Sequence, residues 1–288
     1  MKGVTLIELV VTIALLGILA AVAALYIAPA LEAYFASQRR AEMADAADTA
    51  MRRMMRDIRL ALPNSARVDA SGRFLEVLLT KNGGRYRALN DDDIPAPSGE
   101  NPLTFDAADD SFDVYEPLPL AEIPAEQQVQ GGDYVVIHNL GIAGANAYDL
   151  GAASPNIAQI SGFSFGGGLA NENRITLNPA KQFALESPSR RFFVVSGPVS
   201  YACVGSQLLR WQGYAIQLTH GAPGSNFPPT ARPAGAAQAV LADNLSACSL
   251  EYTALALASQ GLVAVRIGLT RGNETVTLYY EAHINNVP

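Results

Sequence analysis

Cysteine is scarce: the 288 residues contain only Cys203 and Cys248. Two thiols exclude a zinc site built from cysteine alone, because such a site takes four ligands. Two arrangements stay open. The pair forms one disulfide, which requires an oxidising compartment, or the two thiols stay free and pack as small hydrophobic side chains.

Positive charge is also in short supply. Lys and Arg total 20 against 27 Asp and Glu, so the net charge is −7 and the isoelectric point is about 5.0. Nucleic acid is therefore not expected as a partner, because phosphate binding needs a basic face. The chain is 49% hydrophobic and contains 24 Gly and 17 Pro. This composition predicts a folded, turn-rich body with a substantial core.

Catalytic motifs are absent from the sequence. The three histidines, His138, His220 and His283, are far apart and form no H-x-x-x-H pair. No G-x-S-x-G, P-loop or G-x-G-x-x-G motif occurs, and Gly166-Gly167-Gly168 is interpreted as a turn. We therefore predict that the protein is not an enzyme and that it has no cofactor. His138 and His283 are expected to lie in strands.

Two acidic clusters, Asp91–Asp93 and Asp106–Asp110, suggest calcium as an alternative, because Ca²⁺ prefers carboxylates in loops. Neither cluster has the D-x-D-x-D-G spacing of a calcium loop. Acidic loops are more often simply solvated. A structural calcium ion is thus a minor alternative to the prediction of no metal.

The N-terminus contains the one long apolar run. Residues 9–31, between Glu8 and Glu32, carry no charge and are long enough to cross a bilayer as a helix. The segment does not resemble an ordinary secretory signal, because only Lys2 precedes it and no A-x-A site is clearly required after it. Glu8 lies at the N-terminal edge of the apolar run, where an unpaired charge is costly.

Gly3-Val4-Thr5-Leu6-Ile7-Glu8 resembles the prepilin processing motif of type IV pilins and type II secretion pseudopilins. The resemblance implies that a membrane aspartyl peptidase cuts between Gly3 and Val4 and methylates the new N-terminus on Val4. Residues 1–3 are then the leader. Val4 departs from the family, in which phenylalanine is commoner at this position.

The resemblance also implies a role for Glu8. In the family this carboxylate pairs with the N-terminal amine of a neighbouring subunit in the filament. Buried charges persist when paired, whereas removing one partner leaves the other uncompensated. The alternative is a glutamate that snorkels to the headgroups of a plain signal anchor.

The charges that flank the apolar run predict a membrane orientation opposite to the one that the family resemblance implies. Lys2 precedes the run, but Arg39 and Arg40 follow it, and counting these charges alone places the body in the cytoplasm. The prepilin resemblance and the disulfide option place the body in the periplasm. We expect a single-pass protein of the bacterial inner membrane with a periplasmic body, which later moves to the base or tip of a pilus.

The helix is expected to continue beyond the membrane, because residues 37–62 are rich in good helix formers. Apolar residues recur there at steps of three and four, which predicts one buried face: Met43, Ala47, Ala50, Met51, Met54, Ile58, Ala61 and Leu62. Pro63 should end the helix. We predict one helix over 4–62, roughly 88 Å long at 1.5 Å per residue. Its halves are transmembrane (4–31) and amphipathic (32–62), with weak points at Gly17 and Pro29.

Beyond Pro63 the apolar pattern changes to period two, which predicts a β-rich domain over 63–288. The expected strands are Phe74–Leu79, Tyr134–His138, Ile157–Phe165, Arg174–Leu177, Phe192–Val195, Val199–Val204, Gln207–Trp211, Tyr214–Leu218, Ser249–Thr253, Leu262–Thr270 and Thr275–His283. Gly272-Asn273 is a plausible tight turn between the last two. Ile94–Asn101, Ala143–Pro155 and Gly221–Gly235 are expected to be loops. The fold class is therefore α+β and pilin-like: one long N-terminal helix packed against a β-rich domain.

The C-terminal third extends the resemblance. VSGPVSYACVGSQLLRWQGYAI, LADNLSACSLEY and GLVAVRIGLTRGNETVTLYYEAHINNVP are similar to the minor pilin O family of the mannose-sensitive haemagglutinin (MSHA) pilus system, a relative of type II secretion pseudopilin J. Residues 65–190 resemble no family. The resemblance implies that Cys203 and Cys248 form a disulfide and that the subunit primes or caps a pilus.

The partners that the resemblance implies are other minor pilins, the major pilin, prepilin peptidase, the inner-membrane assembly platform and, before assembly, membrane lipid. The alternatives are a type II secretion pseudopilin J and a pilus-tip adhesin that binds a surface or glycan. A signal-anchored periplasmic enzyme is disfavoured, because no catalytic constellation is present.

Overall fold

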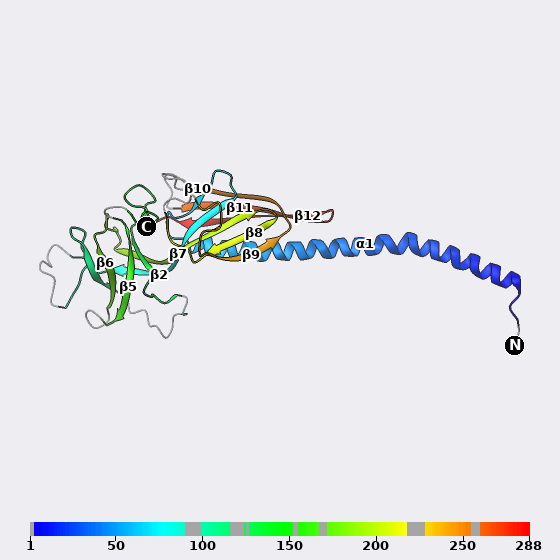
Figure 1. The fold of residues 1–288 in the computed structure, drawn as a ribbon, viewed down its shortest axis with the longest axis horizontal. Coiled ribbons are helices and arrows are strands. Elements are labelled where there is room, and N and C mark those ends of the chain that lie inside the picture. The colour runs from blue at the N-terminus through cyan, green and yellow to red at the C-terminus, as the bar shows by residue number, and fades with distance from the viewer. Residues whose placement is uncertain are drawn as a thin grey trace.

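The computed structural model describes residues 3–89, 99–115, 124, 127–151, 155–166, 172–217, 228–254 and 260–288. The molecule is elongated, with one long helix that projects from a β-rich body (Figure 1). This helix, α1, spans Leu6–Arg59 and runs without interruption through Gly17 and Pro29. The predicted α+β, pilin-like fold class is confirmed.

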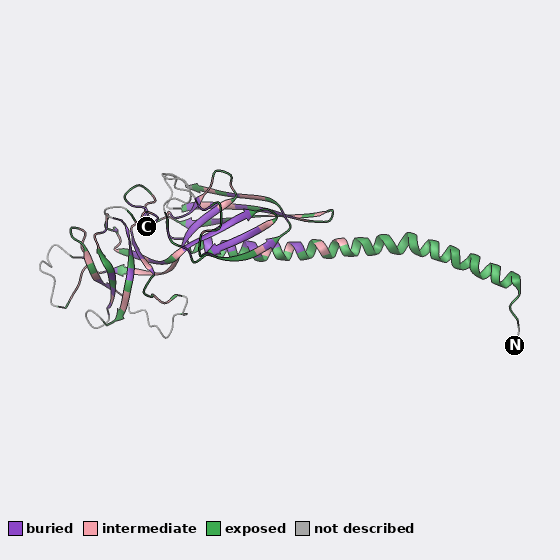
Figure 2. Cartoon of the chain, viewed as in Figure 1, coloured by how far each residue is buried: buried purple, intermediate pink, exposed green. Residues whose placement is uncertain are grey.

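The two halves of α1 lie in different surroundings. The half nearest the N-terminus is exposed along its length, whereas the half nearest the body is buried on one side (Figure 2). The buried side contains the face that the helical periodicity predicts: Met43, Ala47, Ala50, Met51, Met54 and Ile58, together with Met55. The helix ends at Arg59, ahead of Pro63, with Leu60 as its C-cap. The methionine stripe is therefore core packing.

Twelve strands lie in the described part of the body: β1 (Arg67–Val68), β2 (Phe74–Tyr86), β3 (Asp109–Tyr115), β4 (Tyr134–Ile137), β5 (Ile157–Phe165), β6 (Asn173–Lys181), β7 (Arg191–Val204), β8 (Gln207–Gln212), β9 (Ala237–Asp243), β10 (Leu245–Ala254), β11 (Gln260–Arg271) and β12 (Glu274–Asn285). They form a nine-stranded sheet and a separate three-stranded sheet, β10-β11-β12. Within each sheet, every pair of neighbouring strands is antiparallel.

The first of two lobes, the helix lobe, covers the C-terminal half of α1. One layer consists of β8, β9 and the adjoining ends of β2 and β7, and the other is the three-stranded sheet. Apolar side chains from the helix and from both sheets form one core, for example Met54, Tyr201 and Val265. The predicted turn at Gly272-Asn273 joins β11 to β12.

The second lobe, the barrel lobe, is a closed ring of six strands. β2 pairs with β3, and the ring continues through β6, β5 and β4 to β7, which pairs with β2 again. Closure removes the exposed strand edges that promote aggregation. Its interior is a separate hydrophobic core that includes Tyr86, Phe112, Ile160 and Phe192. Five of the six strands of the barrel lobe lie within the span 65–190, which resembles no family in sequence, and the sixth, β7, begins at Arg191.

Strands β2 and β7 run through both lobes and join them. Their pairing shifts register between Leu78 and Thr80 and again between Thr80 and Asn82. Bulges of this kind bend a strand and are common at barrel rims. The expected strands Phe192–Val195 and Val199–Val204 are thus one bent strand, β7, that changes lobes near Gly197.

Some strand predictions are wrong. The described part of Tyr214–Leu218, residues 214–217, is not a strand; Tyr214 and Ile216 alternate inward because they pack on two neighbouring cores. Strands β1, β3 and β9 were not expected. β3 begins within the acidic cluster, whose charges depress strand propensity, and β9 is an alanine-containing edge strand with mostly exposed side chains.

Candidate functional site

The segment before α1 is organised around Thr5 and Glu8. Thr5 is the N-cap, and its Oγ1 accepts a hydrogen bond from the Glu8 backbone N–H at 3.4 Å. In return, Oε2 of Glu8 accepts hydrogen bonds from the Thr5 backbone N–H and from Thr5 Oγ1, both at 3.2 Å. This reciprocal arrangement is a capping box, which satisfies N–H groups that a helix leaves unpaired at its start.

Gly3 and Val4 precede the helix and are exposed; Val4 is 73% exposed. A Cβ atom added at Gly3 would meet no other part of the chain within 4 Å, and Gly3 does not have a positive φ. Neither packing nor backbone geometry therefore requires glycine at this position. If a peptidase recognises the motif, that enzyme, and not the fold of the chain, requires glycine at this position.

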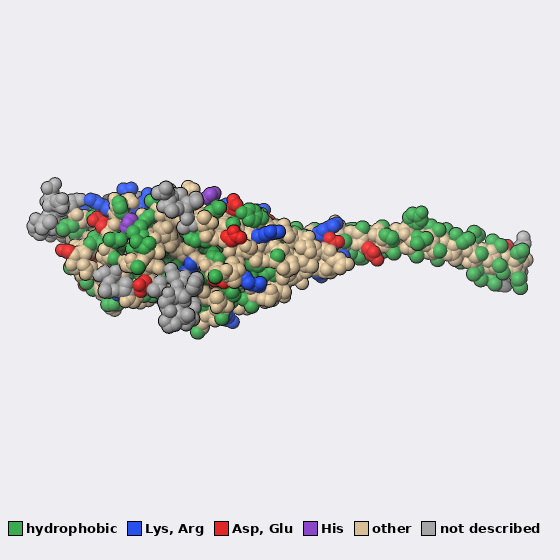
Figure 3. Space-filling view, turned by 90° about the horizontal axis from the view of Figure 1, so that it is seen from above, with side chains coloured by type: hydrophobic (Ala, Val, Ile, Leu, Met, Phe, Trp, Pro, Cys, Tyr) green, Lys and Arg blue, Asp and Glu red, His purple; other side chains and the backbone are tan. Residues whose placement is uncertain are grey.

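The free half of α1 presents a continuous apolar surface. Its exposed side chains include Leu6, Ile13, Leu19 and Leu25, and hydrophobic side chains cover it in Figure 3, whereas charged side chains gather on the body. Among the described residues, one helix, α1, is long and apolar enough to span a membrane. The body does not cover the most apolar segment of this helix. A surface of this size needs lipid or another subunit around it.

Residues 1–24 match the model of the prokaryotic N-terminal methylation motif. This match, at the segment that contains Gly3, Val4 and Glu8, supports a type IV pilin or pseudopilin that is processed by prepilin peptidase and assembles with other pilins. The motif points to a structural subunit rather than to an enzyme. No curated protein and no solved structure matches the chain.

The capping box is the feature of this motif that our sequence reasoning missed. Its signature, Thr5-x-x-Glu8 ahead of an apolar run, is present in the sequence. Glu8 therefore has a role inside its own chain in addition to the predicted pairing between subunits. The two hydrogen bonds that the Glu8 carboxylate accepts from Thr5 both go to Oε2. Its other oxygen, Oε1, makes no hydrogen bond to the described residues. That oxygen is free to accept from a neighbour.

The predicted disulfide between Cys203 and Cys248 is present. Cys203 lies on β7 and Cys248 on β10, with Cα atoms 6.5 Å apart. The bond joins the two sheets of the helix lobe across their shared core, rather than stapling the C-terminal sheet alone. It therefore cross-links the two sheets that share a core with the packed half of α1.

The acidic residues of the second cluster have local partners. Oδ2 of Asp109 accepts from the Thr104 backbone N–H at 2.6 Å, and Oδ1 of Asp110 accepts from the Ser111 hydroxyl at 2.9 Å. Burial raises the pKa of Asp109 despite its bonds to Thr104. Within the described ranges, His, Cys, Asp and Glu side chains form no group of three that could hold a metal ion. Asp91–Asp93 lie outside these ranges.

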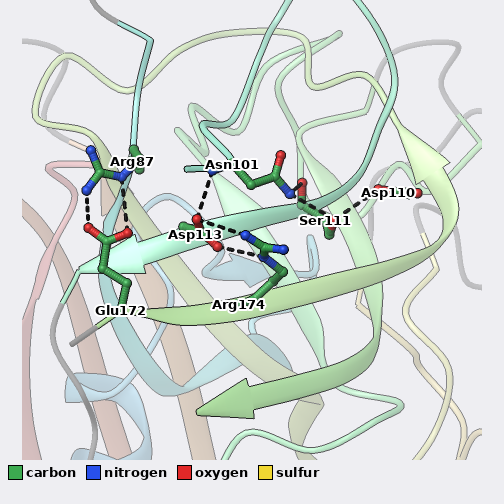
Figure 4. Close-up of polar contacts among 7 residues, drawn as sticks. All are labelled: Arg87, Asn101, Asp110, Ser111, Asp113, Glu172 and Arg174. Carbon is green, nitrogen blue, oxygen red and sulfur yellow. Dashed lines mark hydrogen bonds and ion pairs between the residues drawn. The ribbon is translucent and has the colours of Figure 1, made fainter. Parts of the chain in front are cut away.

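Ion pairs instead tie the strands of the barrel wall together beside this cluster (Figure 4). Asp113 accepts from Arg174 Nε at 2.7 Å and from the Asn101 backbone N–H at 2.8 Å. Arg87 pairs with Glu172, and this hydrogen bond raises the pKa of Arg87. Every one of these side chains contacts another residue of the chain, so the cluster is a structural network of the barrel lobe.

The two histidines that the structure describes, His138 and His283, occupy separate positions. His138 directly follows β4 with a φ of 50°, and its Nδ1 is buried without a hydrogen-bond partner among the described residues. His283 is exposed on β12, and His220 lies outside the described residues. The expectation that His138 sits within a strand is wrong by one residue, because the positive φ ends the strand at Ile137.

Proposed function

We propose that the protein is a minor pilin or pseudopilin-like subunit that helps to prime or cap a type IV pilus of the MSHA type. In this proposal prepilin peptidase cuts between Gly3 and Val4 and methylates Val4. The apolar half of α1 then leaves the inner membrane for a bundle of sister helices, where Glu8 pairs with the N-terminal amine of a neighbour. The body lies in the periplasm until assembly and ends at the base or tip of the filament.

The observation that carries the priming or capping role is the position of the barrel lobe. It extends the body beyond the C-terminal end of α1, roughly along the direction of the helix (Figure 1). In a filament whose subunits stack along their helices, this lobe would occupy the space of the next subunit's body. A subunit of this shape suits a terminal position better than a repeated one.

The processing step is tested by mass spectrometry of the N-terminus, after the full chain is expressed together with a prepilin peptidase. The wild-type chain should begin at methylated Val4, and a Gly3→Trp variant should remain uncleaved in the membrane. Gly3 has no packing role, so this variant should fold normally. A wild-type chain that still begins at Met1, or that begins beyond Ala30, contradicts the proposal.

The position in the filament is tested by immunogold labelling of sheared pili with an antibody against the barrel lobe. Gold at filament ends supports the proposal, and gold along the shaft contradicts it. The barrel lobe would also be the part of the body that binds a surface or glycan if the subunit is a pilus-tip adhesin. Glycan or cell binding that survives in filaments, and is lost when the barrel lobe is blocked by the antibody, would favour that role. A secretion defect with normal pili would favour pseudopilin J.

A further inference from the structure

The β11–β12 hairpin is fastened to α1 just beyond the apolar half of the helix. Nη1 of Arg40 on the helix lies 3.3 Å from Oε2 of Glu274 on the hairpin. In the opposite sense, Nη1 of Arg271 on the hairpin lies 3.0 Å from Oε2 of Glu42 on the helix. These two ion pairs hold the hairpin turn at a defined level along α1.

A shallow pocket of about 440 Å³ lies between this turn and the helix. Its lining includes Phe35, Arg39 and Glu32 from α1, with Asn273 and Glu274 from the hairpin. Nε of Arg39 is buried in the described structure without a hydrogen-bond partner. Buried polar atoms are nearly always paired, so an unpaired one needs an explanation.

The pocket lies at the depth of lipid headgroups if α1 spans the bilayer. Glu32 ends the uncharged run, and Arg39 is seven residues further on, about 10 Å along the axis at 1.5 Å per residue. Helical side chains tilt toward the N-terminus, so Arg39 leans back toward the membrane. The ring of Phe35 packs edge-on against that of Tyr34, with centroids 5.7 Å apart, and aromatic residues are typical of this interface.

The charges around the pocket match a zwitterion. Arg40 and Glu274 compensate each other, whereas Arg39 and Glu32 form no ion pair within the described structure. Arg39 offers donors to a phosphate. The carboxylates of Glu32 and Glu274 can accept hydrogen bonds from the N–H groups of a primary ammonium. A quaternary ammonium has no N–H group and cannot donate such bonds.

We propose that this pocket binds the phosphoethanolamine headgroup of a membrane phospholipid before the subunit joins a filament. Arg39 donates to the phosphate, and the ammonium donates to the carboxylates. The site also accounts for Arg39 beside a body that we place in the periplasm, against the usual bias of flanking charge. The inference rests on the proposed membrane anchoring of α1, but not on the proposed role in the pilus.

The test is native mass spectrometry of the full chain in detergent micelles. The chain is titrated with phosphatidylethanolamine, phosphatidylcholine and phosphatidylglycerol of identical acyl chains, and with free phosphoethanolamine. We expect phosphatidylethanolamine to bind roughly tenfold more tightly than phosphatidylcholine, equivalent to about 1.4 kcal/mol. Free phosphoethanolamine should not compete at the same concentration, because lipid burial contributes to binding.

Arg39→Gln should weaken phosphatidylethanolamine binding, and Glu32→Gln should abolish the preference over phosphatidylcholine. Arg85→Gln, at an exposed position in the barrel lobe, is the matched control and should bind as the wild type does. Circular dichroism checks that each variant is folded. Equal binding of all three lipids, strongest binding of phosphatidylglycerol, competition by the free headgroup or an unaffected Arg39→Gln variant would each overturn the assignment. None of these outcomes bears on cleavage after Gly3, so failure here is distinguishable from failure of the proposed function.

Discussion

Arg210 of β8 and Asp57 of α1 form an ion pair inside the helix lobe, with Nε of Arg210 2.8 Å from Oδ2 of Asp57. Both side chains are almost fully buried, at 7% and 5% exposed. The same carboxylate oxygen accepts a hydrogen bond from the Tyr201 hydroxyl at 2.7 Å. Burial raises the pKa of that tyrosine, and so does the charge of Asp57. The pair links the end of the helix to the sheet that covers it.

Removing Asp57 should therefore be strongly destabilising. Asp57→Ala leaves the Arg210 guanidinium buried without its partner, at a cost of about 3–5 kcal/mol. Arg53, which lies 3.6 Å from the same carboxylate but is half exposed, is the control, and Arg53→Ala should cost at most about 1 kcal/mol. Denaturant unfolding of the full chain in detergent measures both. In the double variant Asp57→Ala with Arg210→Met, the loss should be smaller than the sum of the two single losses. Additive losses would show that the pair is not coupled.

The two roles of Glu8 can be separated by substitution. Glu8→Gln retains an acceptor for the capping box but removes the charge, so the helix should stay capped while filament assembly fails or slows. Thr5→Ala removes the cap at a cost of about 1 kcal/mol but keeps the charge, so assembly should persist. Counting pili on cells that carry only one variant measures the effect. Normal piliation with Glu8→Gln would show that Glu8 is not a pairing residue.

Loss of the disulfide should loosen the contact between the two sheets of the helix lobe. The bond spans a sequence separation of 45, which the chain-entropy model values at about 4 kcal/mol. Cys203→Ser and Cys248→Ser should each lower the unfolding temperature of the full chain by several degrees. The double variant should be no worse than either single variant, because all three lack the same bond. Two free thiols titrated in the unfolded, unreduced wild type would contradict this prediction.

His138 should make stability sensitive to mild acid. Burial lowers the pKa of His138 below its ordinary value of 6.5. As the pH falls below about 6.5, the unfolded chain therefore takes up a proton before the folded chain does, and the free energy of unfolding decreases. His138→Asn keeps a residue that tolerates positive φ and should reduce this decrease. Unfolding at pH 8 and pH 5.5 measures it, and an unchanged pH dependence would exclude His138 as a source.

Local signals made the helix and most of the strands predictable. The apolar steps of three and four from Met43 to Ile58 define a buried face whatever packs against it, because helical geometry alone brings those side chains together. The capping box of Thr5 and Glu8 is local in the same way, because the two residues are three apart at the start of a helix. The strand pair around Gly272-Asn273 is equally local, because its alternation and turn lie in one short segment.

Long-range pairing is what the sequence left open. The barrel lobe depends on β2 meeting β7 more than a hundred residues later, and nothing in either strand specifies that partner. For the same reason the sequence indicated a disulfide but not which sheets it joins. It placed Arg39 after the apolar run, but the pocket beside it exists only because the β11–β12 hairpin folds back onto the helix. The sequence by itself determined the N-terminal motif, the helix and its two faces. Tertiary packing decided the closed barrel, the burial of Asp57 with Arg210 and the pocket, because each requires segments that are distant along the chain to meet.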